Sequence, residues 1–414
     1  MAAIKNNAFV LGATYGAVFA TVALTVVFYA QKWRKARKKR SPLPATGAHT
    51  RRRQLGKSTL HVTELGQGGA SMGDLYTKLD DSVALRALEA AYDAGISFFD
   101  TSPWYGVGLS EMRFGLALHR LPRDQLQVQT KVGRFLVPDP AGLNGVPMGW
   151  IGGLHNRVEF DYTGAAIERQ LEDILQRTGL GRIESLVIHD LEPTPHRRLE
   201  VRAGGETVEL DDGLAAAERH LVELRDGGGF AALQRLRREG KIRAFGAGMN
   251  IDESGEDPQK KRAWNRAYVD ALLELGDRGD GERGIDFLLI ANMHSLLNAE
   301  AKDLGILEKC EAAGVSLIVG GPFSSGILAT GADPPGSSRD SQKGAPKCKA
   351  QWIGAHSSGP RTIDPALSPP PCCFNSLSCY TLPARPPSPL PSSSPPAYGT
   401  AAVAVLVVVL LVDD

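Results

Sequence analysis

The sequence predicts a (β/α)8 barrel of the TIM type in which seven strands are recognisable and the eighth unit is missing. Short apolar segments alternate with amphipathic ones between Leu65 and Pro322, giving seven strands and six intervening helices. This alternation is typical of a parallel sheet covered by helices. Polar residues also end five of these strands, namely Asp100, Lys131, His189, Asn250 and Asn292.

The alternative architecture is a doubly wound sheet. Such a sheet would carry one glycine-rich phosphate turn after its first strand and one ligand crevice where the strand order reverses. A barrel instead places its chemistry at the carboxyl ends of several different strands. Because the polar residues here are spread over five strand ends, the barrel is favoured.

The first elements can be read in chain order. The segment "STLHVTEL" indicates a hairpin arm that leads into the glycine-rich "GQGGASMG". This glycine-rich stretch lacks the G-x-x-x-x-G-K-[ST] spacing of an ATP-binding loop. "DDSVALRALEAAYDAG" places Leu85, Leu88 and Tyr92 on one face, begins with acidic residues and ends at Gly95, so it predicts a capped helix. "ISFFD" is the strand that follows.

The remaining units repeat this pattern. Helix "SEMRFGLALHRL" precedes strand "LQVQTKVG", and helix "AAIERQLEDILQRTGL" precedes strand "IESLVIHD". Three further pairs complete the series: "FAALQRLRREG" with "KIRAFGAGMN", "AWNRAYVDALLELG" with "IDFLLIAN", and "AEAKDLGILEKCEAAG" with "VSLIVGGP".

The region before the barrel predicts a membrane anchor in residues 1–31. Residues 8–30 form a run of 23 positions without a charge, which is long enough for a helix to cross a hydrocarbon core of about 30 Å. A basic linker, residues 32–50, follows with seven Lys and Arg between Lys32 and Arg40. This order is the reverse of a signal peptide, and it predicts a cytosolic or stromal position for everything downstream. An organelle transit region is the alternative.

The barrel-like region covers residues 51–330, and residues 331–414 differ from it in composition. Pro and Ser dominate this tail, which predicts disorder, and it ends in the short apolar run "AAVAVLVVVLLV". Nothing in it resembles an eighth strand, so the sheet edges of strands one and seven are expected to be unpaired. A frame shift, a retained intron or an alternative splice form would account for this pattern.

Composition excludes some classes of function. The formal net charge of +1 gives no general basis for binding nucleic acid. Four of the five cysteines lie in the tail, and the barrel-like region holds only Cys310, which is typical of a protein in a reducing compartment. No spacing of His, Cys, Asp or Glu indicates a metal site.

The strand ends supply a set of groups suited to hydride transfer at a carbonyl. Tyrosine can exchange the proton of the oxygen, and a nearby ammonium lowers its pKa from about 10. A carboxylate holds that ammonium in place, and an imidazole orients the substrate oxygen. Asp100, Tyr105, Lys131 and His189 provide one of each group in strand order. Taken singly, the aspartate would be interpreted as a helix cap, the tyrosine as a packing residue, the lysine as a solvated loop charge and the histidine as a hydrogen-bonded core residue.

From Arg51 to Leu328 the sequence resembles the aldo-keto reductase family, on the motifs "FFDTSPWYG", "QTKVGR" and "VIHD". The resemblance implies that Tyr105 is the general acid/base, that Lys131 tunes it, that Asp100 pairs with Lys131 and that His189 orients the carbonyl. It also implies a nicotinamide cofactor, NADP or NAD, bound across the barrel mouth. From "FGAGMN" it assigns Gly248 and Asn250 to the nicotinamide carboxamide, and from "GGPFSSGIL" it assigns Gly321, Phe323 and Ser325 to the pyrophosphate.

Within this family the sequence looks most like the sugar-oxidising branch, which includes D-threo-aldose (L-fucose) 1-dehydrogenases and L-galactose dehydrogenases. The resemblance implies oxidation of the anomeric carbon of a free sugar to a lactone. The alternatives are a reductase of another small carbonyl such as pyridoxal, and a non-catalytic, membrane-anchored binding module. The oligomeric state, the exact sugar and the choice between NAD and NADP are left open.

Overall fold

The computed structural model describes residues 51–75, 77–140, 150–191, 198–201, 207–211, 213–250, 258–276, 283–323, 380–381 and 403–410. The predicted anchor and basic linker therefore lie outside the described residues, as does most of the tail. No helix in the described ranges is long and apolar enough to cross a membrane.

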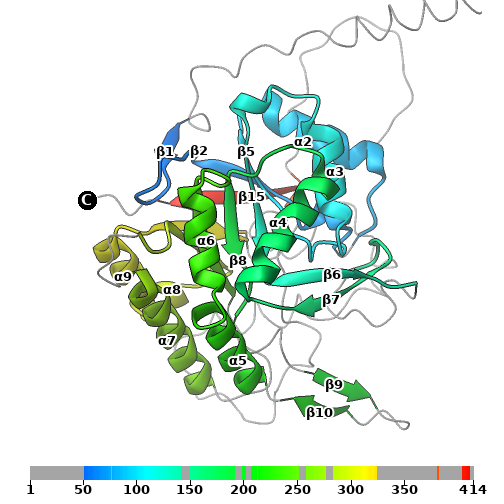
Figure 1. Cartoon of the computed structure of the whole chain (residues 1–414). Coiled ribbons are helices and arrows are strands. Elements are labelled where there is room, and N and C mark those ends of the chain that lie inside the picture. The colour runs from blue at the N-terminus through cyan, green and yellow to red at the C-terminus, as the bar shows by residue number, and fades with distance from the viewer. Residues whose placement is uncertain are drawn as a thin grey trace, which may run out of the picture. The chain divides into compact units, whose positions relative to one another are not determined.

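Seven parallel strands form the centre of the fold and confirm the predicted α/β barrel architecture (Figure 1). Each pairs in parallel with the next one in the chain. The strands are β3 (Leu65–Gly68), β4 (Phe98–Asp100), β5 (Gln127–Val132), β8 (Ser185–Ile188), β11 (Ala244–Asn250), β12 (Phe287–Ala291) and β13 (Ser316–Gly320).

An additional strand, β15 (Val403–Leu410), lies between β13 and β3 and runs antiparallel to both. Val407 pairs with Gly320 on one side and with Gly66 on the other. A two-residue strand, β14 (Tyr380–Thr381), pairs with the beginning of β15. The expectation of unpaired edges at strands one and seven is therefore wrong, because an apolar segment from the far end of the chain pairs with both.

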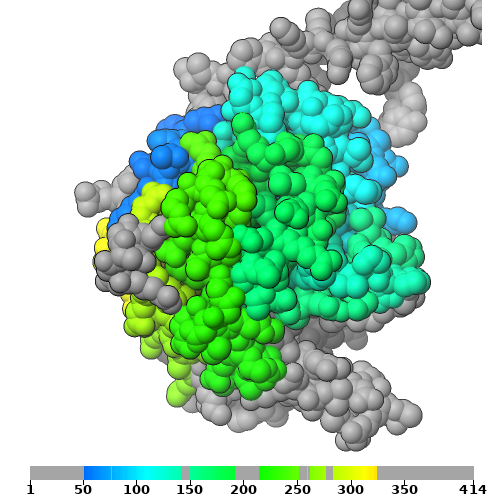
Figure 2. Space-filling view, in the orientation of Figure 1, coloured from blue at the N-terminus to red at the C-terminus, as the bar shows by residue number. Residues whose placement is uncertain are grey.

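Helices cover the outside of the sheet. The first, α2, confirms the predicted cap, since the side chain of Asp80 accepts a hydrogen bond from the backbone of Ser82 at 2.8 Å. In the space-filling view the helices drawn in green, among them α4 and α6, hide the strands behind them (Figure 2). The helices are α2 (Asp81–Asp93), α3 (Leu109–Leu118), α4 (Gly164–Thr178), α5 (Gly213–Arg225), α6 (Gly229–Arg238), α7 (Pro258–Gly276), α8 (Glu300–Asp303) and α9 (Ile306–Ala313), with short 3-10 turns at Ser71–Gly73 and Arg123–Gln125.

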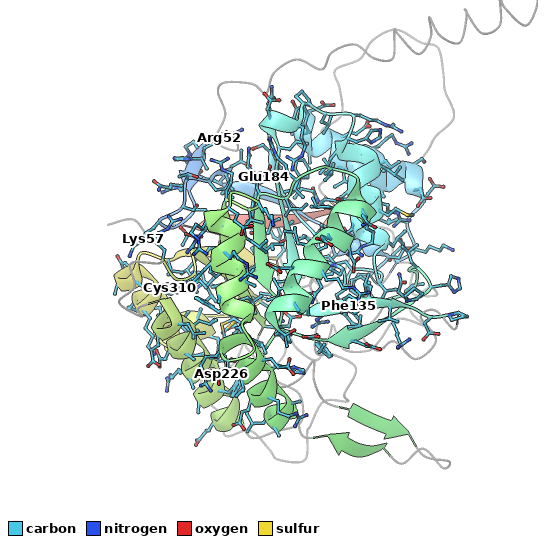
Figure 3. All side chains as sticks on the ribbon, in the orientation of Figure 1. Arg52, Lys57, Phe135, Glu184, Asp226 and Cys310 are labelled. Carbon is cyan, nitrogen blue, oxygen red and sulfur yellow. The ribbon has the colours of Figure 1, made fainter. Side chains whose placement is uncertain are left out.

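Three antiparallel hairpins are attached to the barrel: β1 (Arg52–Gln54) with β2 (His61–Thr63), β6 (Arg134–Pro138) with β7 (Asn156–Phe160), and β9 (Arg198–Val201) with β10 (Thr207–Asp211). Arg52 and Glu184 lie at the end where the strands begin, and Phe135 lies toward the opposite end (Figure 3). The β6–β7 hairpin thus follows the carboxyl end of β5, where the predicted site residues are.

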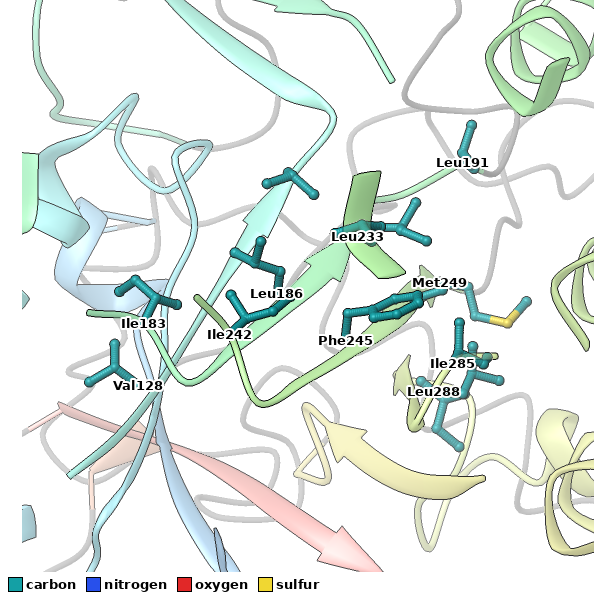
Figure 4. Close-up of a cluster of buried hydrophobic side chains, with 14 of the residues drawn as sticks. Val128, Ile183, Leu186, Leu191, Leu233, Ile242, Phe245, Met249, Ile285 and Leu288 are labelled. Carbon is teal, nitrogen blue, oxygen red and sulfur yellow. The ribbon is translucent and has the colours of Figure 1, made fainter. Parts of the chain in front are cut away.

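Two apolar clusters hold the barrel together. The larger one packs the helices onto the outer face of the strands, as between Leu233 of α6 and Phe245 of β11 (Figure 4). The smaller one joins Leu55, Leu60 and Val62 of the first hairpin region to residues of five strands, including Phe98 and Phe287. This second cluster indicates that the hairpin closes the amino-terminal end of the barrel, so chemistry is left to the other end.

Candidate active site

The four predicted catalytic residues lie together at the carboxyl ends of neighbouring strands. Asp100 is the last residue of β4, Lys131 the fifth of β5, and His189 directly follows β8. Tyr105 is in the connection between β4 and α3. All four side chains are buried, with no more than 3% of any residue exposed. Parallel pairing of β4, β5 and β8 brings these strand ends side by side, which is why residues far apart in sequence meet here.

The Lys131 ammonium is held by an ion pair with Asp100. Its Nζ donates to Oδ1 and Oδ2 of Asp100 at 2.9 and 2.8 Å and to the backbone oxygen of Thr101 at 2.9 Å. Gln129 donates a further hydrogen bond to Asp100 Oδ1 at 2.8 Å. A buried ion pair persists only when its remaining hydrogen-bonding capacity is used in this way. The predicted pairing of Asp100 with Lys131 is therefore present in the geometry.

Tyr105 packs against this ion pair. Lys131 Nζ lies 4.8 Å from the centre of the Tyr105 ring. Burial raises the pKa of Tyr105 well above its ordinary value, the charges of Asp100 and Asp190 raise it further, and Arg134 opposes them. The sequence predicted a lowered pKa, and the structure gives the opposite direction. The reason is that the carboxylate of Asp100 offsets the ammonium and burial disfavours a phenolate.

His189 also lies next to Tyr105, with ring centres 6.3 Å apart in an edge-to-face arrangement. Its Nδ1 is 3.2 Å from the hydroxyl of Ser102, which in turn accepts a hydrogen bond from the backbone of Trp104. Burial lowers the pKa of His189 to about 3, although the neighbouring Asp190 opposes this shift. The imidazole is therefore neutral at pH 7 and suited to hydrogen bonding rather than to carrying charge.

Arg134 and Asp190 complete the buried polar cluster, although neither is among the predicted site residues. Arg134 Nη2 donates to Asp190 Oδ2, and the same oxygen lies 3.1 Å from His189 Nε2. Burial alone would raise the pKa of Asp190, but His189 and Arg134 bring it below its ordinary value. Both residues are the last residues of quoted motifs, Arg134 of "QTKVGR" and Asp190 of "VIHD", and this position in the motifs was the signal available.

Two tryptophans border Tyr105. The ring of Trp150 lies 5.9 Å from the ring of Tyr105 and 5.9 Å from that of Trp104. The guanidinium of Arg134 lies over Trp104, 4.8 Å from its ring centre. Aromatic faces of this kind pack well against the C–H groups of a small ligand, and an arginine on such a face is stabilised by the ring.

Gly133 and Tyr162 fix the ends of β5 and β8 relative to each other. Gly133 has φ +103°, and a Cβ at this position would collide with the ring of Tyr162. The hydroxyl of Tyr162 donates to the backbone oxygen of His189 at 2.6 Å. Because the residue after Lys131 and Val132 must be glycine for this ring to fit, the local backbone sets the separation of the lysine and the histidine.

The residues predicted to bind the cofactor lie on the next strands. Asn250 ends β11 and donates to Asp190 Oδ1 at 3.0 Å, so it joins the cluster around His189. A Cβ at Gly248 would lie 4.0 Å from Asp190 Oδ1. Gly321 and Phe323 follow β13, and a Cβ at Gly321 would lie 2.5 Å from Asn292 Oδ1. Ser325 lies outside the described residues, and the cofactor roles themselves stay predictions.

The Aldo/keto reductase family matches residues 64–358, and the chain belongs to this family of generally NAD(P)-dependent oxidoreductases. Pyridoxal 4-dehydrogenase of Microbacterium luteolum is 33% identical over 67% of this chain and 72% of its own length. D-threo-aldose 1-dehydrogenase of a Pseudomonas species is 32% identical over 65% and 68%. L-galactose dehydrogenase of Arabidopsis thaliana is 27% identical over 48% and 49%.

The described residues fit the nicotinamide end of the cofactor that this family implies. His189 is buried beside Tyr105, its Nε2 lies 3.1 Å from Asp190 Oδ2, and Asn250 donates to the other oxygen of the same carboxylate. Asn250 offers a side-chain carboxamide, which has both a hydrogen-bond acceptor and donors and so suits the carboxamide of a nicotinamide. Tyr105, His189 and Asn250 would therefore border a nicotinamide and the substrate carbon that exchanges a hydride with it.

Proposed function

We propose that this chain is an NAD(P)-dependent dehydrogenase that oxidises the anomeric carbon of a free aldose to a lactone. The observation that carries the proposal is the buried cluster of Tyr105, the Lys131–Asp100 ion pair and a neutral His189 at the carboxyl ends of adjacent strands. The names of two relatives, D-threo-aldose 1-dehydrogenase and L-galactose dehydrogenase, support the choice of substrate class.

Oxidation of a cyclic hemiacetal removes one hydride from carbon and one proton from oxygen. The nicotinamide, when bound, supplies the hydride acceptor. Tyr105, as the phenolate, is the group placed to take the proton and becomes the phenol, and His189 donates a hydrogen bond to the same oxygen. Lys131 stabilises this phenolate before the proton is taken, and Asp100 keeps the ammonium beside the ring. The reverse reaction uses the same groups in the opposite sense.

A second candidate is reduction of a small carbonyl such as pyridoxal. The raised pKa of Tyr105 favours it, because a protonated phenol is the form that donates a proton to a carbonyl oxygen. The relative named pyridoxal 4-dehydrogenase gives the same compound class. Pyridoxal and aldoses both close to cyclic hemiacetals in water, so one site can serve both groups of compounds.

The test is turnover by the full-length chain in detergent, followed as NAD(P)H absorbance with L-galactose, L-fucose and pyridoxal. Tyr105→Phe keeps the ring packing but removes the hydroxyl, and we expect a loss of about 10²- to 10⁴-fold in kcat. The control is Tyr92→Phe, which removes a hydroxyl that bonds Gln125 far from the site. A wild-type chain that binds a nicotinamide but turns over none of these compounds would favour the non-catalytic binding module.

We further propose that residues 1–31 anchor the enzyme to a membrane with the barrel on the cytosolic or stromal side. The proposal rests on the uncharged run at residues 8–30 and the basic residues after it. Alkaline carbonate extraction of membranes from cells that express the chain tests it. Release of the protein into the soluble fraction would contradict the anchor.

A further inference from the structure

Two buried nitrogen atoms near Tyr105 make no hydrogen bond to any part of the chain that the structure describes. They are Arg134 Nε and Trp150 Nε1. A buried N–H without an acceptor costs the free energy of its lost hydration, so native structures rarely leave two of them close together. Their grouping beside the proton-transferring residue points to a ligand that supplies oxygen acceptors.

The tautomer of His189 makes its Nε2 a donor. Oδ2 of Asp190 lies 3.1 Å from Nε2, which favours a proton on that nitrogen. The hydroxyl of Ser102 accepts from the backbone of Trp104 and keeps its own hydrogen for Nδ1. His189 Nε2 is therefore an N–H donor beside Asp190, and Arg134 Nε and Trp150 Nε1 are N–H donors in any state. His189 already has a role at the reacting oxygen, which leaves Arg134 and Trp150 for other oxygens of the ligand.

Arg134 and Trp150 are brought together by Trp104. Both contact Trp104: the guanidinium of Arg134 is 4.8 Å from its ring centre, and the ring of Trp150 is 5.9 Å away. The ring of Trp150 is also 5.9 Å from that of Tyr105. A small ring held at Tyr105 would thus have donors and aromatic faces beside it, which is the combination that binds a polyhydroxylated ring.

The charges of the cluster cancel, which bears on the kind of ligand. Lys131 is paired with Asp100, and Arg134 is paired with Asp190. With a neutral His189 and a protonated Tyr105, the buried cluster has no net charge. An anionic ligand would lose its hydration without meeting an unpaired cation, whereas hydroxyl groups need only the N–H donors.

We propose that Arg134 is a specificity-determining residue whose Nε–H, together with the indole N–H of Trp150, donates hydrogen bonds to neutral hydroxyl oxygens of the substrate near the reacting carbon. The site would then select uncharged, hydroxyl-bearing hemiacetals over hydroxyl-free aldehydes and over sugar acids. This inference rests on the proposed function and names the side chains that would recognise the substrate's hydroxyl groups.

The test compares kcat/KM for L-galactose, for galacturonate and for benzaldehyde, which has no hydroxyl group. Arg134→Lys keeps a positive charge beside Asp190 but removes the guanidinium Nε–H. We expect its kcat/KM for L-galactose to fall about 10- to 100-fold, with that for benzaldehyde changed less than about twofold. Trp150→Phe keeps an aromatic ring and is expected to lower the L-galactose value about 2- to 10-fold.

The matched control is Arg157→Lys, on the half-exposed face of β7, which should leave all three values unchanged. Wild-type chain is expected to prefer L-galactose to galacturonate. An equal loss on L-galactose and benzaldehyde in Arg134→Lys, or no loss on either, would overturn the proposal, as would a preference for the sugar acid.

A failure of the proposed function can be distinguished from a failure of the role proposed for Arg134. If the wild-type chain turns over none of the three compounds, the dehydrogenase assignment is wrong. Ligand-observed NMR then decides the hydroxyl-binding role: saturation transfer to L-galactose in the wild type, reduced at least about tenfold in affinity by Arg134→Lys, supports it. Absence of transfer in the wild type, or equal transfer in both, contradicts it. Thermal melts of each variant exclude misfolding as the cause.

Discussion

Asp190 adopts a left-handed backbone conformation, with φ 44°, although it carries a Cβ. Such a conformation costs on the order of 1 kcal/mol and persists where the surrounding contacts determine it. Those contacts are Arg134 Nη2 on one carboxylate oxygen, Asn250 Nδ2 on the other, and the imidazole of His189 alongside. The backbone conformation of Asp190 therefore allows its single carboxylate to contact three groups of the site.

The buried imidazole of His189 predicts a specific pH dependence of stability. The unfolded chain takes up a proton on this histidine below about pH 6.5, whereas the folded state resists protonation down to a pKa of about 3. The unfolded state thus binds more protons between these values, and its free energy falls as the pH is lowered. We expect His189 to account for a loss of about 2 kcal/mol in the free energy of unfolding between pH 7 and pH 5.

Urea denaturation at pH 7 and pH 5 measures this effect. His189→Gln should remove that part of the pH dependence, and His119→Gln, which alters an exposed residue, should not. Identical pH dependence in the wild type and His189→Gln would show that the imidazole is not kept neutral by the fold.

Single residues of the site differ in how readily the sequence reveals them. Asp100, Tyr105, Lys131 and His189 were predictable because they follow apolar strands in an order that one chemistry requires. Arg134 and Asp190 were not, because a charged residue after a strand is ordinarily a solvated loop charge. Only the packing of strand ends shows that these two charges face each other in a buried position. The pKa of Tyr105 was mispredicted for the same reason, since burial is a property of the assembled barrel.

At the scale of elements, the contact between Gly133 and Tyr162 joins the end of β5 to the segment before α4. Tyr162 is fully buried, and its hydroxyl bonds the backbone oxygen of His189 after β8. The β6–β7 hairpin begins directly after Gly133. One glycine thus allows the chain to leave the barrel, form a hairpin and return without moving the catalytic strand ends.

Gly133→Ala should destabilise the protein strongly. The new Cβ would collide with the Tyr162 ring, and overpacking of a buried site costs about 1–3 kcal/mol. A positive φ adds roughly 1 kcal/mol for a residue with a Cβ. Gly179→Ala is the matched control, because Gly179 also has a positive φ, +64°, but its Cβ would meet nothing within 4 Å.

Thermal or urea unfolding of the two variants measures the difference. Gly133→Ala is expected to lose about 1–3 kcal/mol more than Gly179→Ala. Equal losses would mean that the ring of Tyr162 moves aside at no cost, and that the glycine serves backbone conformation alone.

The barrel strands and most helices were predictable because each shows its periodic pattern of apolar residues within its own segment. Seven strands and the principal helices follow from apolar runs and helical spacing. The hairpins β6–β7 and β9–β10 were missed, and so was α5. The β6–β7 hairpin buries few side chains, so its sequence carries a weak pattern. "RFLVP" of β6 shows no regular alternation in burial, and "NRVEF" of β7 alternates only between partly buried and exposed positions.

At the scale of the whole molecule, β15 makes the sheet continuous between β13 and β3. This pairing could not be predicted from the sequence, because strand partners that are distant in the chain leave no local period. The apolar run "AAVAVLVVVLLV" is evident in the sequence, but it is too short for a membrane span and does not resemble a strand–helix unit of the barrel. The parallel units and the missing eighth unit were predictable, whereas the antiparallel strand that fills its place was not.

Val407→Pro should test the contribution of β15 to stability. Val407 lies opposite Gly320 and Gly66, so the strand is hydrogen-bonded on both sides. Proline removes a donor and is excluded from central strands, and we expect a loss of about 3 kcal/mol or more. Val407→Thr, which keeps β-branching, is the control. Unfolding by urea, monitored by circular dichroism, measures both, and equal stability of the two variants would contradict a structural role for β15.

The position of β15 in the chain has a consequence for synthesis. Its partners β3 and β13 have left the ribosome long before residues 403–410 emerge. Until then the nascent barrel presents two open edges, which other chains can pair with. Closing a contact of such long range is also slow compared with forming neighbouring strand–helix units. The strand that is translated after both of its partners thus sets the moment at which a growing chain stops exposing strand edges to its neighbours, and chaperone dependence should be greatest just before that moment.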